Sequence, residues 1–483
     1  MKELTIQEDI FYPFRNENKS FEDSIVVVAP SLKGQTNSYT LFRFDIGNDP
    51  AENKTLSPVD KSTIVASKSQ TEKIAADPNE PLWRRILALN WLAESYFSQV
   101  SDLILNYAGN DQPSAFLRNS ASLNLGVHHY KPALGLLLSQ LQSVDVGSRE
   151  FAVTALGEMG DRSAAPSVRS CIGDTNETVA SQAIQAVGQL MDSESVPVLL
   201  EVLRNATKSK LYFAATQSLK QIGTADAWSG LIQIVSGRKN DFQARRSSTI
   251  ALGQARYAAA IPPFSKILAD DTEIVGIRLN VINALNAIGG EEAFTAIKGA
   301  CNAKDRTLAF SAIQTMVRSK EGAGETFVLG LAATSTYVHR EEAVNQLGQA
   351  RVISAAPAMK AILHEQNVPV KVRVAALSAL SKIDAKQILP EDLTLVWSDF
   401  QTEKDKYTLD RIADELINAN FAEQSAVSLL IAGLDPQKNK AWYANVKLLR
   451  KLTGQTFGPQ SEYVDPKIRE SELSRWHQWW EQK

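Results

Sequence analysis

The sequence is poor in cysteine, and this scarcity excludes several kinds of site. Its 483 residues include two cysteines, Cys171 and Cys301. Two cysteines cannot form a disulfide framework or a zinc site made of cysteines. The repeat described below places them in equivalent helices four repeats apart, which is too far for a disulfide between them. We therefore expect both to be small, buried apolar side chains.

An excess of one charge is also missing. The 51 Lys and Arg residues nearly balance the 54 Asp and Glu residues, which leaves a net charge of −3. A protein that binds nucleic acid electrostatically needs a basic excess. No apolar run approaches the roughly 18 residues of a transmembrane helix, and the start MKELTIQEDIFYPF lacks the apolar core of a secretory signal. The composition predicts a cytoplasmic protein that binds neither nucleic acid nor membrane.

Histidine and the familiar catalytic motifs are scarce as well. The five histidines are His128, His129, His339, His364 and His477. One His-Glu pair, His364–Glu365, cannot build a two-metal site, and the pair His128–His129 has no evident third ligand. The sequence holds neither a G-x-x-x-x-G-K-[ST] loop nor a G-x-S-x-G elbow. We predict no metal, no cofactor and no enzymatic activity.

What the sequence does contain is a repeat. A six-residue stretch of one shape, typified by ALGEMG and ALGQAR, recurs every 31 to 33 residues. Its copies begin at Trp91, Asn124, Ala155, Ala186, Ser218, Ala251, Ala284, Thr315, Gln346, Ala379 and Ile412. Eleven units with a period near 32 residues are typical of a solenoid, in which each unit buries its apolar face against its neighbours.

Each unit divides into two helical runs. The second run begins seven residues before the copy and carries one apolar stripe, shown by Ile277, Val281, Ala284, Leu285 and Ile288. The first run of the next unit often begins with a proline, a residue that fits the first helical turn. These prolines are Pro166, Pro197, Pro262 and Pro357. Glycines suited to left-handed helix ends follow the second run at Gly160, Gly223 and Gly289.

These patterns predict an all-α protein. We expect an α-solenoid superhelix of about eleven helix pairs over residues 81–435. The pattern V-R-x-x-A-A-x-A-L-G followed by A-x-P-x-L resembles the short HEAT-like repeats of phycobilisome lyases, over about residues 82–435. The resemblance implies the fold, and it leaves a tetrapyrrole (bilin) lyase or lyase-like chaperone as an alternative function. HEAT-like DNA glycosylases and deoxyhypusine hydroxylase are disfavoured by the balanced charge and the few His-Glu pairs.

An arginine at the second position of the second helix also matches the resemblance. It occurs as Arg85, Arg118, Arg149, Arg245, Arg278, Arg340 and Arg373, and it is replaced by Ala180, Tyr212, Ala309 and Lys406. Asp145, Asp241 and Asp305 precede some of these helices by three residues, as in the family. We expect an Arg–Asp ladder that joins successive repeats and has a structural role.

Residues 1–80 lie outside the repeat. The β-branched and aromatic segments Ser24–Pro30 and Tyr39–Ile46 predict a β-hairpin, joined by the polar residues 32–38. Because an isolated hairpin is marginally stable in water, we expect it to dock on the first repeat. Residues 47–80 are polar and are expected to be a linker or a loose wrap around the solenoid. A small ligand-binding domain in residues 1–80 is the alternative.

Residues 436–483 are expected to cap the solenoid. The segment Leu452–Gly458 reads LTGQTFG, and Trp476, Trp479 and Trp480 follow at i, i+3 and i+4, on one face of a helix. This ending resembles that of some bacterial HEAT-repeat proteins. Sealing of the last repeat is one interpretation, and an exposed aromatic docking patch is the other.

Neutral amides dominate one line of the second helices, which are expected to line the concave face. The line is given by the fourth, seventh and eleventh helix positions. Its amides are Gln182, Gln185, Gln189, Gln217, Gln221, Gln254, Asn280, Asn283, Gln314, Asn345 and Gln349. Amides donate and accept hydrogen bonds, so they could bind the backbone of an extended peptide, by analogy with armadillo solenoids. A solvated face, or amides that cross-link repeats, is the alternative.

We therefore predict a non-enzymatic scaffold or adaptor that binds a protein or an extended peptide on this amide line. The sequence leaves the oligomeric state open.

Overall fold

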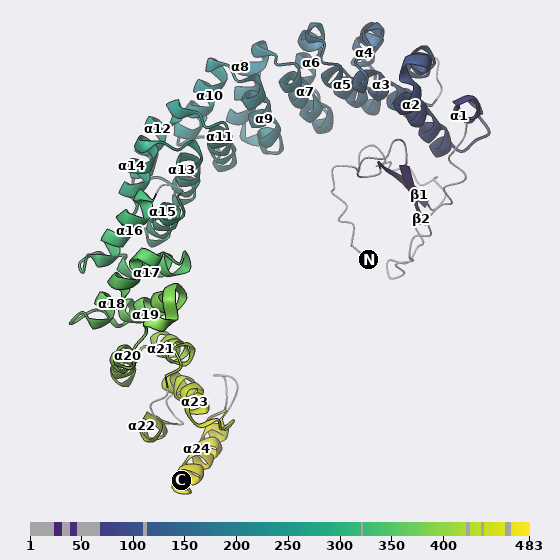
Figure 1. Ribbon diagram of the computed structural model, residues 1–483. Helices are drawn as coiled ribbons and strands as arrows, with labels where there is room; N and C mark the ends of the chain where they lie inside the picture. The colour runs from purple at the N-terminus through teal and green to yellow at the C-terminus, as the bar shows by residue number, and fades with distance from the viewer. Residues whose placement is uncertain are drawn as a thin grey trace. The chain divides into compact units, whose positions relative to one another are not determined.

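The computed structural model describes residues 24–30, 39–45, 68–109, 114–319, 322–421, 426–435, 439–458 and 465–483. Helices follow one another in pairs along this part of the chain (Figure 1). The chain divides into two compact units, which are described in turn. One unit contains the residues up to Leu199 together with Gln217–Ile222, and the other contains Leu200–Thr216 and the residues from Gly223 onward.

In the first unit, the second helices of successive repeats pack on one another. Its α-helices are α1 (Lys68–Ala76), α2 (Leu82–Ala108), α3 (Ala115–Val127), α4 (Leu134–Gln140), α5 (Val146–Met159), α6 (Ala165–Ser170) and α7 (Glu177–Gln189). Helices α2, α3, α5 and α7 contact one another in succession, whereas α4 and α6 each pack on the helix that follows. Helices α8 (Val196–Arg204) and α9 (Tyr212–Ile222) contribute residues to both units.

Helix α2 serves two repeats. Its backbone is non-helical at Tyr96, with φ −140° and ψ 22°. The residues before Tyr96 form the second helix of one pair, and those after it form the first helix of the next. The copy of the repeat that begins at Trp91 therefore ends at this kink, as the register predicts.

The second unit continues the same stacking. Its further α-helices are α10 (Ala225–Ser236), α11 (Phe242–Gln254), α12 (Ile261–Ala269), α13 (Val275–Ile288), α14 (Glu291–Ala300), α15 (Arg306–Arg318), α16 (Ala323–Ala333), α17 (Arg340–Gln349), α18 (Ala356–His364), α19 (Val370–Asp384), α20 (Pro390–Thr402), α21 (Lys406–Asn418), α22 (Ala426–Ala432), α23 (Asn439–Thr453) and α24 (Pro466–Glu481). The odd-numbered helices from α11 to α23 contact one another in succession and form a second-helix layer. The all-α solenoid predicted from the sequence is confirmed.

Short 3-10 turns precede or follow several first helices. They are η3 (Lys131–Ala133), η4 (Arg162–Ala164), η5 (Cys171–Gly173), η6 (Ser193–Ser195), η7 (Ala206–Leu211), η8 (Ala258–Ala260), η9 (Ile353–Ala355) and η10 (Ala385–Gln387). The predicted prolines lie in the first turn of the helix that follows, as at Pro166 in α6 and Pro357 in α18. The pyrrolidine ring replaces an N–H that would have no partner within the helix.

The N-terminal strands pair as expected. Strands β1 (Ser24–Pro30) and β2 (Tyr39–Asp45) are antiparallel, with Ser24 opposite Asp45 and Pro30 opposite Tyr39. The predicted connection at 32–38 and residues 47–67 of the predicted linker lie outside the described residues.

The linker prediction is wrong for residues 68–76, which form helix α1. This helix packs on α2. Ala75 is buried, and Arg85 of α2 donates a hydrogen bond from Nε to the Ala75 carbonyl oxygen at 3.0 Å. A carbonyl at the end of a helix lacks a partner within the helix, so this bond stabilises a helix that few apolar side chains hold.

Most second helices among the described residues end in a residue with positive φ. Gly160, Gly223 and Gly289 have φ of 70°, 65° and 77°, which confirms their predicted role as helix ends. Non-glycine residues fill the equivalent place in other repeats with φ of 50° to 57°, and these are His129, Met191, Arg256, Arg351 and Asn420. The backbone geometry of this turn is therefore kept even where the side chain disfavours it.

Glycines inside the second helices let neighbouring repeats approach closely. A Cβ added to Gly348 of α17 would lie 2.5 Å from the Ala379 Cα of α19. The same addition at Gly253 of α11 would lie 2.9 Å from the Ala284 Cα of α13. The recurring Ala-Leu-Gly sequence thus places a glycine of one repeat against the alanine of the next.

Candidate functional site

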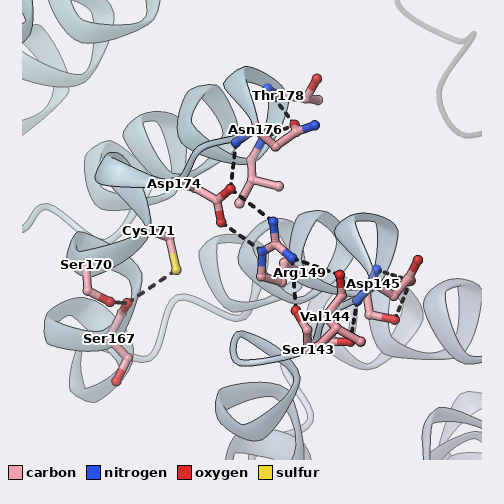
Figure 2. Close-up of polar contacts among 12 residues, drawn as sticks. Ser143, Val144, Asp145, Arg149, Ser167, Ser170, Cys171, Asp174, Asn176 and Thr178 are labelled. Atoms are coloured by element: carbon pink, nitrogen blue, oxygen red, sulfur yellow. Dashed lines mark hydrogen bonds and ion pairs between the residues drawn. The ribbon is translucent and has the colours of Figure 1, made fainter.

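Arginines join successive repeats, and Arg149 illustrates the geometry (Figure 2). Its Nε and Nη2 donate to the two carboxylate oxygens of Asp174 in the next repeat, at 2.8 and 3.0 Å. Its Nη1 donates to the Ser143 and Val144 carbonyl oxygens, at 2.9 and 3.3 Å. The hydrogen bond from Arg149 holds the pKa of Asp174 below its usual value.

Three further arginines, all in the second unit, also bind an acidic residue of the next repeat. Arg245 donates from Nη1 and Nη2 to Glu273 at 3.0 and 2.6 Å, and Arg340 binds Glu365 at the same two distances. Arg373 donates to Asp399 at 2.6 Å. Asp174, Glu273 and Glu365 follow the first helix of the next repeat, and Asp399 lies within its first helix α20. Each arginine thereby ties its own repeat to the next one. These contacts support the structural role predicted for the arginines.

The predicted aspartate partners were wrong. Asp145, Asp241 and Asp305 accept hydrogen bonds from backbone N–H groups in the first turn of their own helices, so they are N-caps. The acids that bind the arginines follow them by 25 to 28 residues. An acidic residue at that spacing is the sequence signal that would have identified the correct partners.

The cysteine and histidine side chains are engaged in structural contacts. Both cysteines are free and buried, as predicted, and burial raises the pKa of Cys301 to about 12. The neighbours His364 and Glu365 point to different partners, since His364 contacts Asp392 at 2.8 Å whereas Glu365 binds Arg340. Within the described residues, no three metal-ligating side chains gather at one place.

All eleven predicted amides lie on the surface of the second helices. In the first unit, Gln182 and Gln217 are half-buried, whereas Gln185, Gln189 and Gln221 are exposed. The Gln189 Nε2 donates to Glu158 Oε1 of the preceding repeat at 2.9 Å. Gln189 therefore cross-links two repeats. The side chains of the other four amides form no hydrogen bond with the described residues.

In the second unit the amides divide in the same way. Asn280 donates to the Gly276 carbonyl oxygen at 2.6 Å, and Asn345 accepts from Arg411 at 3.0 Å. Gln349 accepts from Gln346 at 3.2 Å, and the exposed Gln254 is also engaged. Asn283 is exposed and Gln314 is half-buried, and neither forms a side-chain hydrogen bond with the described residues. Six of the eleven amides thus keep their polar atoms available.

Sequence reasoning missed a second line of residues on the same helices. One turn before the amide line, successive second helices carry Phe213, Arg246, Leu279 and Phe310. Phe213 is 70% exposed and Phe310 is 37% exposed. The spacing of 33, 33 and 31 residues equals the repeat, which is the signal that could have identified this line.

The three C-terminal tryptophans do not share one environment. Trp476 is fully buried, and its ring packs edge-on against Phe457 with centroids 5.1 Å apart. Trp479 is half-buried and Trp480 is 39% exposed. Trp476 therefore supports the sealing interpretation, and a docking patch stays a prediction for the other two.

A family model described as HEAT repeats matches residues 134–220. A comparison with curated protein sequences finds no match. Among solved structures, the phycocyanin lyase CpcE–CpcF complex from Nostoc sp. PCC7120 is 18% identical, with a TM-score of 0.31 over 52% of this chain and 97% of that one. Human deoxyhypusine hydroxylase is 17% identical, with a TM-score of 0.25 over 54% and 99%. The karyopherin Kap121p bound to Ste12p is 13% identical, with a TM-score of 0.47 over 86% and 52%.

The stacked helix pairs and the matched repeats define the class of the protein, an α-solenoid. More specifically, its residues 134–220 match HEAT repeats. The structural similarities are too low to carry an activity to this chain from those proteins, so the bilin-lyase alternative stays a prediction. None of the described helices combines the length and the apolar character that crossing a bilayer requires.

Proposed function

We propose that this protein is a non-enzymatic scaffold that binds a protein or an extended peptide on the surface of its second helices. The observation that carries the proposal is the set of available amides on the second helices of each unit. Gln182, Gln185, Gln217 and Gln221 lie in the first unit, and Asn283 and Gln314 lie in the second.

Amide side chains suit a peptide backbone because each offers an acceptor and two donors in fixed geometry. A peptide in an extended conformation has free N–H and C=O groups along its length, and these need partners when water is displaced. Amides repeated along a solenoid provide such partners without regard to the peptide's side chains. The site therefore favours recognition of a backbone over recognition of a charge.

The test is a comparison of paired variants. Gln185→Ala with Gln217→Ala removes two amides of the first unit, and Asn283→Ala with Gln314→Ala removes two of the second. Proteins captured by the wild-type chain would be identified by mass spectrometry, and the affinity of each purified partner would then be measured by calorimetry. At about 1 kcal/mol for each hydrogen bond, a pair that contacts the partner should weaken binding roughly tenfold or more.

The matched control replaces polar residues outside the second-helix layer. Gln142→Ala lies after α4, in the connection to α5, and is exposed. It should leave the affinity unchanged. A partner that binds both double variants and their combination as tightly as it binds wild type would rule out the amide surface as its site.

A further inference from the structure

We call the second line of residues the anchor row. It runs across the helices and consists of Phe213, Arg246, Leu279 and Phe310. Each residue comes from a different second helix, in the order α9, α11, α13 and α15, and all four belong to the second unit. Phe213 and Arg246 are exposed, and Leu279 and Phe310 retain part of their exposure. Large apolar side chains at the same position of successive repeats form an unpartnered surface.

A second row lies one helical turn further along. Ile250, Asn283 and Gln314 follow the anchor residues of α11, α13 and α15 by four positions, so each pair shares one face of its helix. Ile250 is 36% exposed. The apolar and cationic anchors thus lie beside two amides whose polar atoms are available.

The distance between anchors selects the conformation of a partner. Packed helices lie about 8–10 Å apart. A β-strand presents side chains on one face about every 6.7 Å. A polyproline II helix has three residues per turn and a rise of about 3.1 Å, so it presents one side chain about every 9.3 Å. Of these two conformations, polyproline II has the spacing that matches one anchor per repeat.

Charge gives the partner a second feature. The exposed Arg246 contacts Gln243 of its own helix at 3.4 Å, and no carboxylate among the described residues pairs with it. The next position of the row, on α17, is Glu341, which is bound by Arg411 and lies 3.8 Å from Arg306. The anchor row therefore carries one unpaired positive charge, that of Arg246. At the next position the charge of Glu341 is neutralised by arginines.

We propose that the anchor row binds a polyproline II segment that has apolar side chains at every third residue and an acidic residue opposite Arg246. This inference rests on the proposed function and specifies its partner. The backbone of a polyproline II helix forms no internal hydrogen bonds, so Asn283 and Gln314 can donate to its carbonyl oxygens. The three aromatic and aliphatic anchors provide the apolar contact that such segments use elsewhere.

The experiment uses the full chain and labelled ten-residue peptides in fluorescence anisotropy. The probe is Leu-Pro-Pro-Glu-Pro-Pro-Leu-Pro-Pro-Leu, tested in both sequence directions. Its control has the same composition with the three leucines adjacent. We expect the probe in one direction to bind at least tenfold more tightly than the control. Phe213→Ser and Phe310→Ser should each weaken it at least fivefold.

Two variants make the result specific. Arg246→Gln should weaken the probe about tenfold and should have no effect on a probe whose glutamate is replaced by glutamine. Ile353→Ser removes an apolar side chain that is 79% exposed in η9, before a first helix, and it should change nothing.

Equal affinity for the probe and the permuted control, or no binding of either, would overturn the inference. The proposed function is judged separately. A natural partner that loses affinity in the amide variants would sustain the scaffold even if the polyproline probe failed, whereas a partner indifferent to those variants would remove it.

Discussion

Arg245 and Glu273 form an ion pair between repeats in which both side chains are withdrawn from water. Their side chains are 1% and 4% exposed. The Arg245 Nε also donates to the Val235 carbonyl oxygen at 2.7 Å, so the guanidinium caps one helix while it holds the next repeat. The Arg245 hydrogen bonds keep the pKa of Glu273 below its ordinary value. Removing one partner of a buried, hydrogen-bonded ion pair is costly, because it leaves the other charge buried and unpaired.

We therefore predict that Arg245→Met lowers the free energy of unfolding by about 3–5 kcal/mol, because it leaves a buried carboxylate without a partner. The double variant Arg245→Met with Glu273→Leu should recover most of that loss. The matched control is Arg238→Met, whose partner Asp270 is 38% exposed and which should cost at most about 1 kcal/mol. Urea unfolding, with amide exchange to locate the change at α11, measures all three.

The same pair predicts a pH dependence. A carboxyl whose pKa is lower in the folded chain adds stability above its unfolded pKa, and this stability is lost as the pH falls through the folded value. Stability should therefore decline as the pH drops below about 4.3. The double variant should decline less steeply than wild type over that range. Identical slopes would mean that Glu273 contributes nothing to acid unfolding.

At this scale the sequence predicted the arginines better than their partners. The arginine recurs at a fixed helix position, so its role follows from the repeat. The acidic residue that binds each arginine follows it at a variable distance in the sequence. Asp174 follows Arg149 by 25 residues, whereas Glu273 follows Arg245 by 28, because the connection between helices changes length. The nearby Asp145 and Asp241 were misleading, since an aspartate before a helix is needed as an N-cap whether or not an arginine is near.

At the scale of helices, the close approach of neighbouring second helices depends on glycine. Gly348 of α17 faces the backbone of Ala379, where an added Cβ would lie 2.5 Å from Cα. Gly330 of α16 has no atom within 4 Å of the same position and is exposed. The two glycines thus differ only in what a methyl group would meet.

This contrast predicts opposite effects of one substitution. Gly348→Ala should destabilise the protein by about 1–3 kcal/mol, because α17 and α19 must move apart. Gly330→Ala should stabilise it by about 0.5–1 kcal/mol, because alanine favours the helix. Thermal unfolding of both variants beside wild type checks the prediction. A stabilising Gly348→Ala would show that the helices have room to spare.

The sequence predicted helices better than it predicted their limits. The apolar stripe and the recurring Ala-Leu-Gly fixed the second helices, including the weak one at Ile412, which is α21. Helix α1 was missed because its residues 68–76 are polar, and only Thr71 and Ala75 are buried. Its stability comes from α2 and Arg85, which a local pattern cannot show. The sequence predicted where the amides lie. Which of them are engaged in hydrogen bonds depends on partners such as Arg411, which lies two repeats from Asn345.

At the scale of the whole molecule, stability is the sum of repeats and the contacts between neighbours. Helix α22 contacts both α23 and α24. Helices α22 (Ala426–Ala432) and α23 (Asn439–Thr453) form a further pair, since they pack on each other and α23 packs on α21. The predicted boundary at 435 falls between them. Phe457 then packs on Trp476 of α24, and the Arg450 Nε donates to the Phe457 carbonyl oxygen at 3.0 Å.

Because each repeat packs mainly on its neighbours, damage at this end should stay local. Trp476→Ala removes a buried indole and should cost about 3–5 kcal/mol of local stability. Amide exchange by mass spectrometry should show faster exchange in α22, α23 and α24 and unchanged exchange in α13 and α15. Trp480→Ala is the control, since its side chain is 39% exposed and its removal should stay within about 0.5 kcal/mol. Faster exchange along all the described helices in Trp476→Ala would mean instead that the chain unfolds as one block, and the additive description would then be wrong.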